Sequence, residues 1–146
     1  MDSPKELSTE LFTGRMDGDV AVVQVRDRLP VRLSDLAAKG TAFDHLEAVA
    51  ASDSIRSMVI LDPHQASRKE EYLDFLSSLR NQDSGFTARL CNAANQVVTQ
   101  LATFSKPMVA AGHGRIVSLL LNMGLAADYR VVSTETVFVN PGISMG

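Results

Sequence analysis

The sequence has no tryptophan, one cysteine and an aromatic share of only 5%. The single cysteine, Cys91, excludes an intramolecular disulfide and a multi-cysteine zinc site, and it fits a reducing compartment. A core with so few aromatic side chains has to be built from Val, Leu, Ile, Met and Ala, which suits layered α/β packing. The chain also lacks an apolar run of the ~18 residues that a membrane helix needs. Its first six residues are too polar for a signal peptide, so we expect a soluble, cytoplasmic protein without a membrane partner.

Charge and composition indicate an ordinary globular domain and no particular class of partner. The formal net charge is -3, which provides no electrostatic reason to expect nucleic acid or anionic lipid as the main partner. With 146 residues, 45% hydrophobic and 21% charged, the chain has the balance of one globular domain. No internal repeat or low-complexity tract divides it. We therefore expect a single domain over residues 1–146, with residues 1–18 as a polar, frayed or edge-pairing lead-in.

Hydrophobic periodicity predicts alternating strands and helices. Strands are expected at residues 19–26, 57–61, 108–111, 129–132 and 136–139. Helices are expected from an N-cap at Ser34 to about Ala51, over 69–79, from 86 to 101, and over 118–127. The short, continuously apolar run at 57–61 is typical of a strand that is buried on both faces of a largely parallel sheet. The order of elements predicts an α/β fold.

The most specific pattern lies in residues 106–146. This segment begins with Lys-Pro and continues through a strand, a turn that ends at Gly114, a helix that leads to Asp128, and a strand around Phe138 followed by Pro141. It resembles the crotonase superfamily, whose best-known members are the enoyl-CoA hydratases and isomerases. The resemblance implies an α/β, crotonase-like (ClpP/crotonase) spiral of ββα units that binds an acyl-CoA thioester.

Such proteins are expected to hold the thioester-derived enolate oxygen with two backbone N–H groups. A helix N-terminus suits this role because its unbonded N–H groups and its dipole both favour an anion. The resemblance places one donor at Leu119, flanked by Ser118 and Leu120 as ligand-contacting positions, where the family usually has consecutive glycines. It places the other donor at Ala66, in a shortened loop. Coenzyme A then enters as part of the substrate, and neither a resident cofactor nor a metal ion is expected.

The chain departs from the family at the catalytic carboxylates. Asn122 and Gly142 stand where hydratases have glutamates. An amide is not a general base near neutral pH and glycine has no side chain, so ordinary hydratase chemistry is not expected. The absence of the later glutamate also argues against the isomerase reaction. The reaction type, whether lyase, isomerase or hydrolase, therefore stays open.

Other groups could supply the missing acid or base. His113 lies in the turn before the pocket helix, and His64 lies in the shortened loop; turn hydrogen bonding and a solvated loop are the alternatives for these two. The carboxylates Glu70, Glu71 and Asp74 lie on a helix that borders the acyl pocket in the family, but a solvated helix face explains them better.

Three further residues have structural explanations. Cys91 has no nearby cation in the sequence and is expected to be a buried, inert thiol. His45 is expected to be a half-buried packing residue. Asp128, with Arg130 two residues later, is expected to hold a turn or an ion pair. No cluster of His, Cys and carboxylates has metal-ligand spacing, and no P-loop or nucleophile elbow occurs.

Two hypotheses follow. The first is an acyl-CoA enzyme of the enoyl-CoA hydratase/isomerase group, connected to fatty acid metabolism and forming a homotrimer or dimer of trimers in its full-length form. The second is a non-catalytic relative that keeps the fold for assembly or regulation. An open cleft beside Leu119 favours the first, and a cleft plugged by Leu119 favours the second. Because family domains are longer, we also expect the domain to be truncated on its C-terminal side. Resemblance only to the wider spiral fold of ClpP-type peptidases is a third possibility, but no serine–histidine pair can be assigned to it.

Overall fold

The computed structural model describes residues 7–62 and 68–140, and they form two sheets. The larger sheet has the strand order β1-β2-β3-β4-β6, in which only the β1–β2 pair is antiparallel. A smaller sheet pairs β5 with β7 in parallel. The strands are β1 (Phe12–Asp17), β2 (Val20–Val25), β3 (Ser57–Asp62), β4 (Met108–Gly112), β5 (Arg115–Val117), β6 (Tyr129–Val132) and β7 (Val137–Val139). The expected α/β fold with a largely parallel sheet is confirmed.

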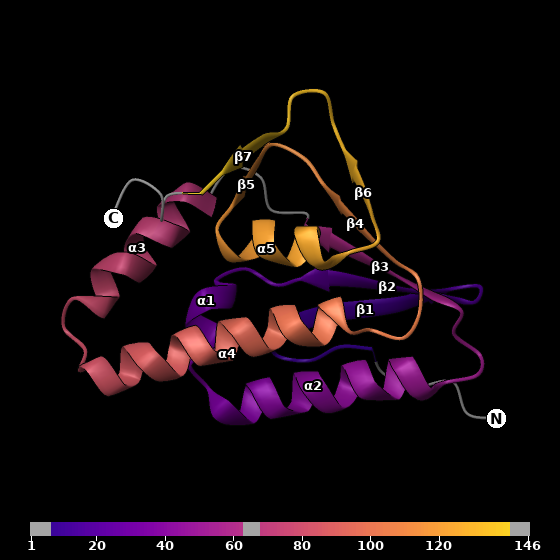
Figure 1. The fold of residues 1–146 in the computed structure, drawn as a ribbon, viewed down its shortest axis with the longest axis horizontal. Helices are drawn as coiled ribbons and strands as arrows, with labels where there is room; N and C mark the ends of the chain where they lie inside the picture. Colours follow the sequence, from indigo (N-terminus) through magenta and orange to yellow (C-terminus); the bar gives the residue numbers. More distant parts are fainter. Residues whose placement is uncertain (1–6, 63–67, 141–146) are drawn as a thin grey trace.

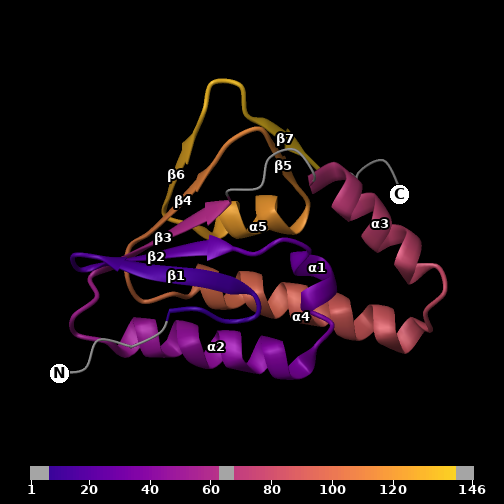
Figure 2. The same ribbon diagram turned by 180° about the vertical axis from the view of Figure 1, so that it is seen from behind.

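Five helices accompany the strands within the described residues. They are α1 (Leu29–Arg32), α2 (Leu36–Ala51), α3 (Arg68–Leu79), α4 (Ser84–Ala102) and α5 (Leu119–Ala126). In both ribbon views α2 and α4 run alongside each other below the strands, and α3 projects to one side (Figures 1 and 2). Three elements were not predicted from periodicity. α1 and β5 are too short to show a repeat, and β1 lies within residues 1–18, which were expected to be a frayed or edge-pairing lead-in.

The last part of the chain winds as a spiral. In Figure 1, β4 and β6 form one side of a triangle, β5 and β7 form a second side, and α5 forms the base. Successive turns are stacked by pairing equivalent strands, β4 with β6 and β5 with β7. This is the predicted spiral of ββα units.

Local chemistry explains where the helices begin. Asp35 caps α2, because its carboxylate accepts from the N–H groups of Ala37 and Ala38. The predicted N-cap, Ser34, was wrong by one residue: its hydroxyl donates to the Val31 carbonyl of the preceding turn instead. Leu36 is apolar but 62% exposed, because it begins the helix on the solvent side.

Lys106 and Asp128 fix the start of β4. The Lys106 ammonium donates to the carbonyls of Val49, Ser52 and Ile55 and so closes the C-terminal end of α2. The Asp128 carboxylate accepts from the Met108 N–H at 2.8 Å, and its own N–H donates to the Met108 carbonyl. Asp128 is therefore structural, as expected, although its partner is backbone.

The core extends further toward the N-terminus than expected. Leu11 and Phe12, which belong to the segment predicted as a polar lead-in, are buried against the sheet. Cys91 is exposed, so its prediction as a buried thiol was wrong; it lies on α4, one residue from the buried Leu90. His45 is half-buried on α2, as predicted, and burial lowers its pKa.

The final turn of the spiral has little cover. Tyr129, Val131 and Phe138 are 69%, 61% and 52% exposed, although they lie on strands. By contrast, Val23 and Met58, on the interior strands β2 and β3, are buried. Among the described residues, no helix is both long enough and apolar enough to cross a membrane.

Candidate functional site

The start of α5 has an unusual backbone. Ser118, its N-cap, adopts φ 51° and ψ -113°, a combination that favours glycine, and its N–H donates to the Val139 carbonyl at 3.1 Å. The Ser118 carbonyl accepts its helical hydrogen bond from the Asn122 N–H. Within the described part of the chain, the N–H groups of Leu119, Leu120 and Leu121 make no hydrogen bond. They are the free donors of a helix N-terminus.

The Leu119 side chain decides how much room remains at these donors. It is 9% exposed and belongs to the hydrophobic core. A hollow of about 20 Å³ between Leu119, Tyr72 and Pro30 has room for one water molecule. A larger, mostly apolar cavity of about 220 Å³ continues from Leu119 between α3 and α4, and Cys91 lies on its wall.

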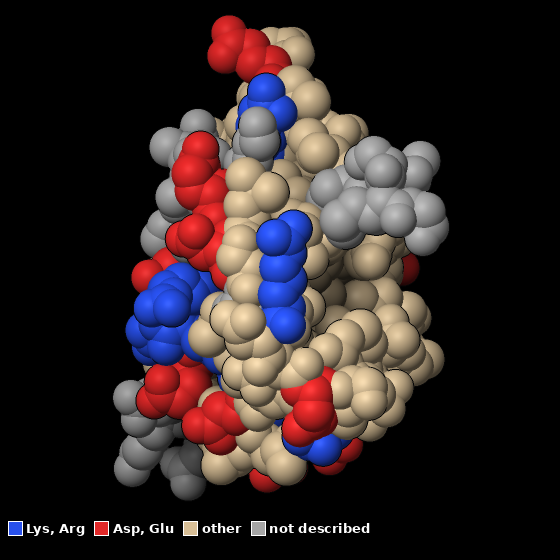
Figure 3. Space-filling view, turned by 90° about the vertical axis from the view of Figure 1, so that its left-hand side faces the viewer, with Lys and Arg blue, Asp and Glu red and all other residues tan. Residues whose placement is uncertain are grey.

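Figure 3 shows the side of the molecule on which α3 lies. Charged side chains of both signs gather on one half of this face, whereas the other half is largely uncharged and hollowed. An apolar hollow of this kind suits a hydrocarbon group better than a charged one.

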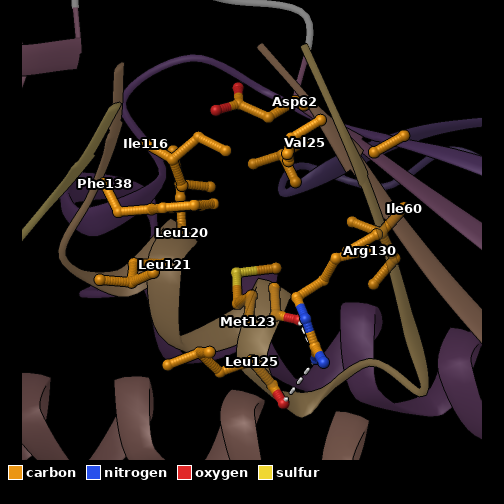
Figure 4. A pocket seen from close by; sticks show the side chains of 15 residues that line it. Val25, Ile60, Asp62, Ile116, Leu120, Leu121, Met123, Leu125, Arg130 and Phe138 are labelled. Atoms are coloured by element: carbon orange, nitrogen blue, oxygen red, sulfur yellow. Dashed lines mark hydrogen bonds between the residues drawn. The ribbon is translucent and has the colours of Figure 1, made fainter. Parts of the chain in front are cut away.

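A second cavity of about 330 Å³ lies on the sheet side of α5 (Figure 4). Strand register explains it, since Ile60 pairs with Ala110, which pairs with Arg130, and the next inward row is Asp62, Gly112 and Val132. Strand β4, between β3 and β6, thus contributes only Ala110, Ala111 and Gly112 to the lining. Such small side chains leave space that Leu120, Met123 and Phe138 do not fill.

An open groove of about 490 Å³ adjoins this cavity at the carboxyl ends of β3, β4 and β6. Asp62, Ala111, Gly112 and Val132 line both hollows. His113 and Ser133, each the first residue after its strand, line only the groove. The carboxyl edge of parallel strands is a common place for ligands in open α/β sheets.

The predicted site residues divide into two groups. Ser118, Leu119 and Leu120 come together at the start of α5, as the resemblance implied, and His113 lies apart from them in the groove. Asn122 is exposed and lines none of the four hollows. The predicted positions Ala66, His64 and Gly142 lie outside the described residues, so their assignments remain predictions.

The remaining candidates lie away from these hollows or have structural roles. Glu70 and Asp74 are exposed on α3, in agreement with a solvated helix face, and the Glu71 side chain is not described. Arg130 contributes to the cavity wall, but its guanidinium donates to the Ala127 carbonyl at 3.0 Å. Among residues 7–62 and 68–140, no three His, Cys, Asp or Glu side chains could hold a metal ion.

Asp62 is the residue that the sequence analysis missed. The expected strand at 57–61 stops one residue before it, yet Asp62 lines both the cavity and the groove. The signal was present in the alternation of β3, because Asp62 follows Ile60 by two residues and must face the same side.

Comparison with known proteins supports the fold. No known family profile matches the sequence, and no curated protein sequence matches it. A solved structure of an enoyl-CoA hydratase/isomerase family protein from Silicibacter pomeroyi is 20% identical, with a TM-score of 0.71 over 93% of this chain and 56% of that chain. An enoyl-CoA hydratase from Shewanella pealeana is 13% identical, with a TM-score of 0.74 over 97% of this chain and 53% of that chain.

A third structure, an enoyl-CoA hydratase from Polaromonas sp. JS666, is 21% identical, with a TM-score of 0.72 over 92% of this chain and 52% of that chain. The chain has the crotonase-like α/β fold of these proteins and spans about half of their length. Fold alone does not assign a reaction, which has to be argued from the site.

Proposed function

We propose that this chain binds an acyl-CoA thioester without carrying out ordinary hydratase chemistry. The observation that carries the proposal is the group of unbonded N–H donors at Leu119, Leu120 and Leu121, beside an apolar cavity. The N–H groups would hold the thioester oxygen, and the cavity between α3 and α4 would take the acyl chain. Three structural neighbours are described as enoyl-CoA hydratases or as members of that family, which supports this choice of ligand.

The side chains around the N-terminus of α5 argue against hydration. Hydration needs an acid and a base to move protons to and from water and carbon. The polar side chains on the two small hollows are Tyr72, Cys91 and Ser118, with no carboxylate among the described lining residues. Asn122, at a usual glutamate position, is exposed and lines neither hollow.

A second candidate, a non-catalytic scaffold or regulatory protein, is favoured by the Leu119 side chain. Its burial leaves about 20 Å³ in the hollow at the start of α5, which is too little for a thioester. Binding would then require Leu119 to move, whereas a scaffold needs no such movement.

Calorimetric titration with acetoacetyl-CoA and free CoA separates the two candidates. Acetoacetyl-CoA mimics the enolate, so formed and accessible donors should bind it at least about tenfold more tightly than CoA. This preference in the unmodified chain supports the binding function. No binding by the folded chain, together with binding by Leu119→Ala, means that the site is plugged and supports the scaffold.

Leu125→Ala is the matched control. It removes the same side chain from the same helix, but Leu125 is not one of the donors and lines the sheet-side cavity, not the hollow at Leu119. It should therefore leave the titration unchanged. If the unmodified chain and both folded variants fail to distinguish acetoacetyl-CoA from CoA, the acyl-thioester proposal is wrong.

A further inference from the structure

We infer that the sheet-side cavity is a second binding site, which takes an aliphatic carboxylate of medium chain length with its hydrocarbon chain in the cavity and its carboxylate group at Arg130. This site differs from the thioester site proposed above. It lies on the opposite side of α5, and its lining includes neither Leu119 nor any residue of α3.

The cavity has the size and lining for a hydrocarbon chain. Its volume, about 330 Å³, lies near the lower limit of small-molecule sites, which favours a chain of medium length over a long one. Most of its lining residues are apolar, among them Ile60, Leu120, Met123 and Phe138. In Figure 4 these side chains surround one hollow. A hydrocarbon chain gains affinity with each methylene that it buries in such a hollow.

The charged side chains of the lining determine which way the ligand lies. Arg130 and Asp62 both line the cavity, and Figure 4 shows the guanidinium beside Met123 and Leu125, at the opposite end from Asp62. Asp62 has contacts of its own within the protein, and its negative charge repels a ligand carboxylate from that end. The ligand carboxylate is therefore directed to the Arg130 end.

Arg130 has unused donors for that carboxylate. Within the described residues only its Nη1 atom donates, to the carbonyls of Gly124, Leu125 and Ala127. A guanidinium has five N–H donors, so the edge formed by Nε and Nη2 remains open to a ligand. This edge matches the two oxygens of a carboxylate in a bidentate contact.

The surroundings of Arg130 favour an anion at its free edge. Among the described residues, no Asp or Glu side chain forms an ion pair with it. Arg130 is also exposed, whereas Met123, farther into the cavity, is buried. A ligand can thus bury its hydrocarbon chain while its carboxylate stays in contact with water, which avoids the free-energy cost of burying a charge.

Calorimetric titration of the chain with octanoate, octylamine and octanol, near neutral pH and at low salt, tests the ligand class. Octanoate should bind about tenfold or more tightly than octylamine, because the two ligands have the same chain length and differ in the sign of the charge at Arg130. Added salt should weaken octanoate binding and leave octanol binding nearly unchanged, because only the charged ligand is screened.

Arg130→Met tests the role of the guanidinium. It should weaken octanoate binding by about fivefold or more and leave octanol binding nearly unchanged, because methionine keeps an apolar side chain at the cavity wall and loses the charged donors. Arg115→Met is the matched control. It removes the same charge from an exposed residue of β5 that does not line the cavity, so the octanoate affinity should stay the same.

Gly124→Leu tests the location. Gly124 lines the cavity, and a Cβ built on it meets nothing within 4 Å, so leucine at this position fills the space without a clash. It should weaken octanoate and octanol binding by about tenfold or more. Gly40→Leu is the control, because Gly40 lies on α2 with equally open space and does not line the cavity.

Several results would overturn the inference. They are octylamine binding as tightly as octanoate, equal effects of Arg130→Met and Arg115→Met, equal effects of Gly124→Leu and Gly40→Leu, and no binding of octanoate to the folded chain. Displacement of octanoate by acetoacetyl-CoA would also overturn it, because the two ligands would then share one site. Failure of acetoacetyl-CoA alone to bind would contradict only the thioester proposal.

Discussion

An interior strand and an edge strand of the larger sheet have similar residues in opposite environments. β2 and β6 are both rich in valine, yet Val23 on β2 is buried and Val131 on β6 is 61% exposed. β2 lies between two strands, whereas β6 is the last strand of the larger sheet. Residue type therefore predicts the strand, but its position in the stack of strands decides whether the strand contributes to the core.

The largest expected contrast comes from placing one charge on each of these two strands. Val23→Asp should destabilise the protein by at least about 3 kcal/mol, because it buries an unpaired carboxylate. Val131→Asp should change stability by less than about 0.5 kcal/mol at its exposed site. Urea unfolding of both variants measures the difference, and equal losses would mean that the two strands are buried alike.

Two cationic side chains at helix C-termini, one partly buried and one exposed, should differ by an intermediate amount in their effect on stability. Lys106 is partly buried and closes α2, whereas Arg130 is exposed and closes α5. Lys106→Met should cost about 2 kcal/mol, because three carbonyls lose a charged donor. Arg130→Met should cost less than about 1 kcal/mol, since water can replace it. Denaturation midpoints of the two variants test this order. A greater loss of stability in Arg130→Met than in Lys106→Met would contradict it.

Replacing the strained residue at the start of α5 should have a smaller effect, and it should increase stability. Ser118→Gly should stabilise the protein by about 1 kcal/mol, because glycine adopts a positive φ without a steric penalty. Ser133→Gly, at a serine whose φ is not positive, should be neutral or destabilising. Thermal unfolding compares them, and a loss of stability in Ser118→Gly would contradict the strain.

The smallest expected effect depends on pH. Burial lowers the pKa of His45 from its ordinary value of 6.5, so the unfolded chain binds the proton more readily than the folded one. The stability contributed by neutral His45 is complete above pH 6.5 and is lost as the pH falls from there toward the lowered pKa. Unfolding of the wild type and of His45→Gln between about pH 5 and pH 8 should show a shallower acid loss in the variant. Parallel curves would contradict this expectation.

Sequence patterns were sufficient for five of the seven described strands and for the longer helices. Valine-rich runs and helical spacing depend on neighbours close in sequence, so β2, β3, α3 and β6 appear near their expected positions. The short elements α1 and β5 could not be found in this way, because α1 depends on packing and β5 on pairing with the distant β7.

The candidate site was only partly predictable. Ser118, Leu119 and Leu120 are consecutive residues, so a sequence resemblance can locate them together. The direction of the Leu119 side chain could not be predicted, because it depends on residues of α3 and α4 that come much earlier in the chain. The exposure of Cys91 has the same cause, since periodicity locates the buried face of a helix but not its edges.

The sequence by itself determined the α/β order, which follows from residue type and spacing. Its resemblance to a known family predicted the spiral of ββα units and placed Asn122 and Gly142 at the positions of the usual glutamates. Tertiary structure alone decided that Leu119 is buried, that the small residues Ala110 and Gly112 leave a cavity, and that Asp62 and His113 reach one groove. These features depend on strand register and on contacts between distant segments. Local periodicity does not encode such contacts, and only the packed fold brings them about.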